Sequence, residues 1–134
     1  MLANVIEGFA MLDERSRAAE LYPLSLELIS TGAVNVWTSA RLTQTVAGIA
    51  AAAAREWKAA EDHFQTALQQ AESFPNRLEP AEIHRFHAMM LIDRATRGDR
   101  ETAKTLLAKA LETYTRVGMP RHIEMTQTLL DRCK

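Results

Sequence analysis

Residues 60–68, AEDHFQTAL, and residues 103–111, AKTLLAKAL, carry one short pattern twice. Each segment has an alanine, a large apolar residue four positions later, and a second alanine three positions after that. A weaker copy, AAELYPLSL at residues 18–26, lies near the N-terminus, so that the copies begin 42 and 43 residues apart. A fixed period of this length is typical of stacked supersecondary units. The pattern therefore predicts a helical repeat fold and favours binding over catalysis.

Composition limits the class of protein. The chain has 134 residues, a net charge of −1 and 47% hydrophobic residues, as expected of one soluble globular domain spanning residues 1–134. Its charge predicts no nucleic-acid partner, and no apolar run reaches the length that spans a membrane. The first residues lack the pattern of a signal peptide, and Cys133 is the one cysteine. We therefore expect a cytoplasmic protein.

Helical spacing and breaker residues predict an all-α chain of about seven helices, arranged as a solenoid of helical hairpins. No stretch alternates with the period of a strand, which argues against a sheet. Pro23 predicts a kink or a late start in the second helix, expected at about residues 14–29. The third helix is expected from Asn35 or Ser39 to Ala54, and Pro80 is expected to open the fifth. The predicted hairpins cover about residues 1–32, 35–74 and 80–117, followed by a closing helix at about 121–132.

The repeated alanines have a physical reason. Ala60 and Ala67 lie two helical turns apart on one face, with Phe64 between them as a bulky side chain. Small residues at such positions let two antiparallel helices cross closely. We therefore expect these residues at the helix–helix contact within each hairpin.

These residues resemble the tetratricopeptide repeat, whose second helix ends in alanine, an aromatic residue and alanine. Gly48 lies twelve residues before Ala60, where that repeat has its first-helix glycine. The repeat's tryptophan and tyrosine positions are not matched, and its usual period of about 34 residues is exceeded. The chain is therefore similar to a divergent repeat of this type.

Longer stretches, including residues 57–71 (WKAAEDHFQTALQQA) and 98–122, resemble the C-terminal helical repeats of large bacterial signalling proteins. Those proteins combine a P-loop ATPase module with a cyclase domain or a LuxR-type DNA-binding domain. The resemblance implies a non-catalytic regulatory or protein-interaction segment of a signal-transduction or transcription-regulatory protein. It also implies that the chain is part of a longer protein, and it carries over no catalytic residue.

No motif of the chain predicts catalysis or a cofactor. A glycine-rich phosphate loop is missing from the sequence. His84 and His87 share a helical face, but two histidines fall short of the three or four ligands of a usual metal site. Cys133 lies next to the C-terminus, where an incidental thiol is more probable than a nucleophile. We therefore expect no enzyme, no cofactor and no metal.

A concave surface lined by the first helix of each hairpin is the expected binding site. Its apolar character suits a protein or peptide partner, although the same residues could instead form the core or be covered by the closing helix. An exposed face of the first hairpin could also pair two copies as a homodimer. A small-ligand sensor near Ile49 and Met89 is the alternative function. The predicted groove comprises Met11, Leu42, Thr45, Ile49, Arg85, Met89 and Ile92.

Overall fold

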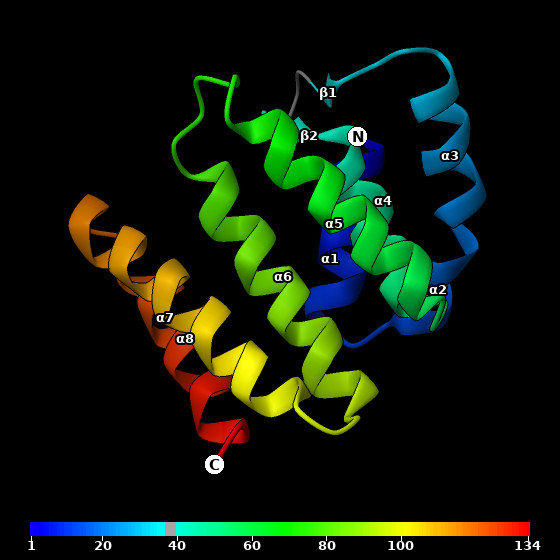
Figure 1. The fold of residues 1–134 in the computed structure, drawn as a ribbon. Helices are drawn as coiled ribbons and strands as arrows, with labels where there is room; N and C mark the ends of the chain where they lie inside the picture. The colour runs from blue at the N-terminus through cyan, green and yellow to red at the C-terminus, as the bar shows by residue number, and fades with distance from the viewer. Residues whose placement is uncertain (37–39) are drawn as a thin grey trace. The chain divides into compact units, whose positions relative to one another are not determined.

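The computed structural model describes residues 1–36 and 40–134, and it is helical throughout most of them. The chain divides into two compact units, residues 1–76 and 77–134. The first contains α1 (Leu2–Met11), α2 (Arg15–Glu20), α3 (Tyr22–Ser30), β1 (Asn35–Val36), β2 (Arg41–Leu42), α4 (Thr43–Ala53) and α5 (Trp57–Ala71). The second contains α6 (Glu79–Arg94), α7 (Asp99–Val117) and α8 (Pro120–Arg132) (Figure 1). The all-α prediction is confirmed.

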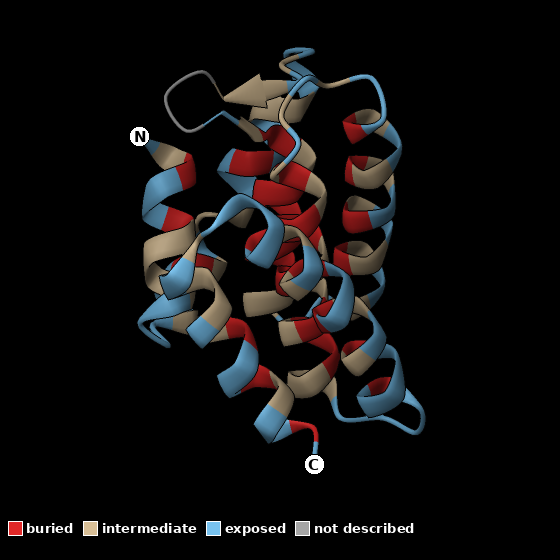
Figure 2. Cartoon of the chain, turned by 90° about the vertical axis from the view of Figure 1, so that its left-hand side faces the viewer, coloured by how far each residue is buried: buried red, intermediate tan, exposed pale blue. Residues whose placement is uncertain are grey.

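Hairpins form the body of each unit, and the repeated pattern marks where their helices meet. In unit 1, α4 packs against α5 and also contacts α1, α2 and α3. In unit 2, α6 packs against α7, and α8 lies mainly on α7. Figure 2 shows the resulting stripes of buried residues along the helices. The pattern residues are fully buried in both hairpins: Ala60, Phe64 and Ala67 in α5, and Ala103, Leu107 and Ala110 in α7.

The contact between Gly48 and Phe64 shows how closely α4 and α5 approach. A methyl group at Gly48 would stand 2.7 Å from Phe64 Cε1 and 2.8 Å from Cδ1. These distances are shorter than carbon–carbon van der Waals contact, so the ring occupies the space that any side chain at residue 48 would need. The positions 43 residues after Gly48 and Phe64 are Leu91 and Leu107 in unit 2, and both are buried. One hairpin thus combines glycine with phenylalanine, and the other combines two leucines.

The predicted second helix is divided at Leu21 into α2 and α3. Pro23 lies in the first turn of α3, where its missing N–H costs no helical hydrogen bond. Of the kink or late start predicted from Pro23, the structure has an interruption: the chain is helical from Arg15, and a new helix begins at Tyr22. After α3, Gly32 has a φ of +80° and ends the helix in the left-handed conformation that glycine adopts readily.

The predicted third helix begins later than expected. Asn35–Val36 and Arg41–Leu42 form a short antiparallel ribbon, which corrects the prediction that the chain has no sheet. Leu42 is extended, with φ −67° and ψ 138°, so α4 starts only at Thr43. The Arg41 guanidinium is held by two hydrogen bonds to Glu7 of α1, a long-range contact that local sequence does not encode. The other predicted start, Ser39, lies outside the described residues.

Gly98 and Asp99 predict that the fifth helix runs to about Arg97 and is followed by a C-cap and an N-cap, and the turn between α6 and α7 differs from this in detail. Helix α6 ends at Arg94, because Ala95 takes a left-handed conformation with φ 53°. Gly98 is the N-cap of α7, and Asp99 is its first residue rather than its cap. The Asp99 carboxylate accepts hydrogen bonds from Arg94 and from the backbone N–H and hydroxyl of Thr96. It therefore fastens the turn instead of capping the helix.

Candidate functional site

The predicted groove residues are divided between the two units. Residues 11, 42, 45 and 49 belong to unit 1, and residues 85, 89 and 92 belong to unit 2. Met11 is exposed, and Met89 and Ile92 are partly buried. The remaining four side chains, Leu42, Thr45, Ile49 and Arg85, are almost completely buried. These four are core positions in this conformation, and the groove itself stays a prediction.

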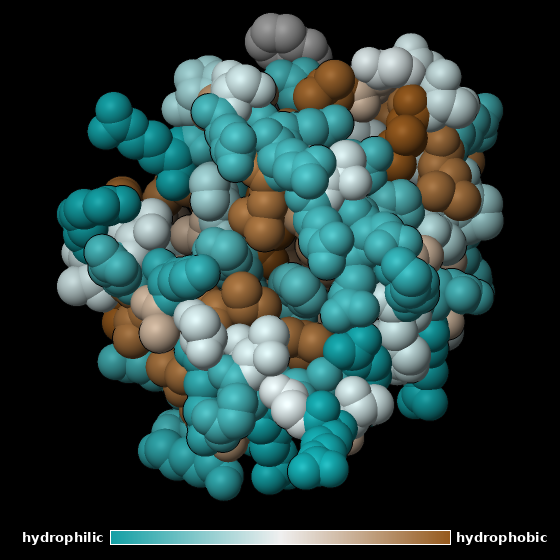
Figure 3. All heavy atoms as spheres, in the orientation of Figure 1, coloured by the Kyte–Doolittle hydropathy of each residue, from teal (hydrophilic) through white to brown (hydrophobic). Residues whose placement is uncertain are grey.

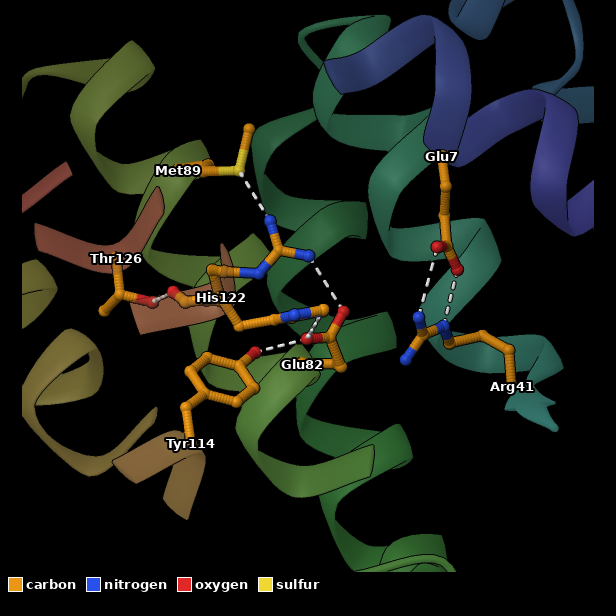
Figure 4. A network of polar contacts seen from close by, with 8 residues as sticks. Glu7, Arg41, Glu82, Met89, Tyr114, His122 and Thr126 are labelled. Carbon is orange, nitrogen blue, oxygen red and sulfur yellow. Dashed lines mark hydrogen bonds and ion pairs between the residues drawn. The ribbon is translucent and has the colours of Figure 1, made fainter. Parts of the chain in front are cut away.

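A cluster of titratable side chains lies where the three helices of unit 2 meet (Figure 4). Glu82 of α6 accepts a short hydrogen bond from the Tyr114 hydroxyl of α7. Its other carboxylate oxygen accepts a hydrogen bond from Arg85 Nη2 at 2.8 Å. His122 of α8 places Nε2 3.6 Å from Glu82 Oε1, and its ring lies 5.0 Å from the Tyr114 ring. The cluster therefore joins α6, α7 and α8 through one carboxylate.

The electrostatics of this cluster set the protonation of Arg85 and Tyr114. Burial disfavours the charged guanidinium of Arg85, but the Glu82 carboxylate outweighs burial and raises the pKa of Arg85. Burial and the same carboxylate raise the pKa of Tyr114 well above its ordinary value. Arg85 also lies over the Phe86 ring, with Cζ 4.3 Å from the ring centroid. Tyr114 is thus a neutral hydrogen-bond donor, and Arg85 remains charged.

The cluster is suited to holding helices together and poorly suited to catalysis. The side chains of Glu82 and Arg85 are 6% and 4% exposed, and Tyr114 is fully buried. A substrate would have to displace the contacts that satisfy these groups. Removing one partner of a buried ion pair costs several kcal/mol. The arrangement is therefore a structural anchor.

Unit 1 has a second polar cluster, in which Tyr22 of α3, Gln44 of α4 and His63 of α5 form a chain. Gln44 Oε1 lies 2.7 Å from His63 Nδ1, so Nδ1 carries the proton and Nε2 accepts the Tyr22 hydroxyl at 3.1 Å. Burial lowers the pKa of His63, and burial followed by the charge of Glu56 raises the pKa of Tyr22. Both pKa shifts keep Tyr22 and His63 neutral, so these hydrogen bonds join α3 to the α4–α5 hairpin.

His84 and His87 both lie in α6 and are partly buried. Burial, followed by the charges of Lys109 and His87, lowers the pKa of His84 to about 4. In the part of the chain that the structure describes, no group of three or more His, Cys, Asp or Glu side chains is arranged to hold a metal ion. The histidine pair is therefore part of the packing of α6.

Exposed apolar side chains are concentrated in unit 1. Leu24 and Leu26 of α3 are 47% and 41% exposed, on either side of the buried Ser25. Figure 3, in the orientation of Figure 1, shows hydrophobic side chains gathered over α3. Of the eight large hydrophobic residues that are exposed among the described ones, only Val117 belongs to unit 2. The other seven are Met1, Val5, Met11, Leu12, Leu24, Leu26 and Val34.

Sequence reasoning missed the two polar clusters and the exposed face of α3. Tyr114 and Glu82 are 32 residues apart, and no local pattern pairs them. The apolar composition of α3, YPLSLELIS, was a usable signal, because a helix that is hydrophobic on all sides needs a cover on all sides.

The comparisons with known proteins give no family for the chain. No protein-family model, no curated protein and no solved structure matches it. Among the described helices, none is both long enough and apolar enough to cross a bilayer.

Proposed function

We propose that the chain is a non-catalytic protein-interaction module built from tetratricopeptide-like helical hairpins, and that it acts in the cytoplasm as a regulatory segment. Two observations support the repeat type. The repeated alanines are buried at the helix contacts of both hairpins, and Gly48 receives the Phe64 ring. The burial of the titratable cluster around Glu82 supports a role without catalysis.

The binding surface that we propose consists of the exposed apolar side chains of α3, and its occupant is a second copy of the chain. The exposure of Leu24 and Leu26 carries the proposal. Of the five exposed residues of α3, Pro23, Leu24 and Leu26 are apolar, and Glu27 is the one charged residue. Leu24 and Leu26, two positions apart, lie on opposite flanks of the helix. Such surfaces mark sites of protein association. Pairing of two identical surfaces about a two-fold axis covers both of them at once.

Light scattering after size-exclusion chromatography tests this surface. We expect the wild type to run as a dimer whose mass falls on dilution, and Leu24→Asp combined with Leu26→Asp to run as a monomer. Gln65→Glu is the control, because it adds a charge to an exposed position of α5 in the same unit. A wild type that stays monomeric at high concentration would refute the second copy as the occupant. A dimer that survives both aspartates would refute α3 as the surface.

A further inference from the structure

Helix α8 is held at both ends by pairs of a basic and an acidic side chain. His122 Nε2 lies 3.6 Å from Glu82 Oε1, and Arg132 Nη2 lies 3.6 Å from Asp93 Oδ1. The two acids are eleven residues apart on α6, which is about 16.5 Å at 1.5 Å per residue. The two bases are ten residues apart on α8, about 15 Å. Helix α8 therefore runs parallel to α6, with His122 and Arg132 spaced to match Glu82 and Asp93.

Apolar side chains occupy the interval between these pairs. Met119 and Ile123 pack against a small core formed by Ala81, Ala110 and Tyr114. Thr126 and Leu129 are buried further along the same helix. Positions 119, 123, 126 and 129 follow the spacing of one helical face. The surface under α8 thus has an apolar centre and an acidic side chain at each end.

The attachment of α8 is weaker than that of the other two helices. Two residues of α8 are buried, against five of α7 and nine of α6. The Arg132 side chain is 52% exposed and the His122 side chain 29%, and ion pairs in contact with water contribute little. Helices with few buried contacts open locally without global unfolding. Helix α8 joins α7 through Gly118, which has a left-handed φ of 80° and ends α7.

We propose that the face of α6 and α7 beneath α8 is a second binding site, which α8 occupies in the closed chain and a partner's amphipathic helix occupies when α8 opens. The partner helix carries a basic residue, apolar residues one and seven positions later, and a second basic residue at position ten. This is the pattern of His122, Ile123, Leu129 and Arg132, and the charges of Glu82 and Asp93 select it. The inference rests on the proposed role in protein binding but uses a different surface from α3.

The test measures binding of a fluorescein-labelled peptide of residues 119–134 to the full chain by fluorescence anisotropy. His122→Glu places a second carboxylate beside Glu82 and opens α8, so the fraction of chains with a free site rises. Apparent affinity rises in proportion to that fraction, and we expect the variant to bind the peptide at least about tenfold more tightly than the wild type. Gln127→Glu, on the exposed side of α8, is the matched control and should bind like the wild type.

A second measurement separates opening from unfolding. In His122→Glu, hydrogen exchange should accelerate across residues 120–132 while α6 and α7 stay protected. A peptide that carries the same His122→Glu change should lose its binding to this variant. The proposal is overturned if the variant opens α8 without binding the wild-type peptide, or if α6 and α7 lose protection together with α8. The readouts here are peptide binding and local hydrogen exchange. They are independent of the molar mass from light scattering, which tests the α3 surface.

Discussion

Replacing Gly48 with alanine tests the packing on which the hairpin interpretation depends. The new methyl group would stand 2.7 and 2.8 Å from two ring carbons of Phe64, which is fully buried in a close-packed interior. Overpacking of this kind costs about 1–3 kcal/mol. Alanine is also a better helix former than glycine by about 1 kcal/mol, which offsets part of that cost. We therefore expect a net loss of about 1 kcal/mol in the free energy of unfolding.

Gly8→Ala in α1 is the matched control, because a methyl group there meets no atom within 4 Å. Both substitutions gain the same helix propensity, so the difference between them isolates the steric cost, about 1–3 kcal/mol. Urea unfolding followed by tryptophan fluorescence is the assay, since Trp57 is the first residue of α5 in unit 1. Equal stabilisation by the two alanines would refute the close approach of α4 and α5.

A double-mutant cycle extends the same test. Phe64→Leu shortens the side chain and creates the leucine that unit 2 has at residue 107. The methyl group of an alanine at residue 48 then has room. The double variant should therefore lose about 1 kcal/mol less unfolding free energy than the two single variants lose together. Additivity within about 0.5 kcal/mol would mean that the two residues are not in contact.

Three further predictions concern the polar groups of unit 2. The pKa of His84 is lowered from 6.5 to about 4, so the folded state disfavours the protonated imidazole. The contribution of His84 to stability is therefore complete above pH 6.5 and is lost as the pH drops towards 4. The urea midpoints measured at the two ends of this range should differ less in His84→Gln than in the wild type. Tyr114→Phe removes a donor to the buried Glu82 carboxylate and should cost about 1–3 kcal/mol in thermal unfolding, whereas a shift of zero would contradict the anchoring role. Asp99→Ala deletes the acceptor of Arg94 and Thr96 and should cost about 1–2 kcal/mol, which Asp99→Asn should recover in part.

The sequence predicted the elements that depend on local patterns. The alanine positions and the interruption of the helix near Pro23 depend on spacing and backbone preference, and the structure has both. The short ribbon was missed, because its position depends on Arg41 reaching Glu7 across 34 residues. The stop of α6 at Ala95 was missed because alanine rarely adopts a left-handed conformation.

The predicted groove shows a different limit. Leu42, Thr45 and Ile49 were assigned to a binding face, because a helical pattern reveals which residues share a side but not what covers that side. The Glu82 cluster was missed for the related reason that its members come from three helices. Residue type and spacing fix a helix face, whereas the partners of that face depend on the tertiary arrangement.

Hydrogen exchange of α3 at low and at high protein concentration tests the central claim most directly. If the exposed apolar side chains of α3 bind a second copy, the amides of residues 22–30 should gain protection as concentration rises, while the amides of α7 stay unchanged. The same gain should be lost in the Leu24→Asp, Leu26→Asp variant. Exchange in α3 that is independent of concentration would contradict the account.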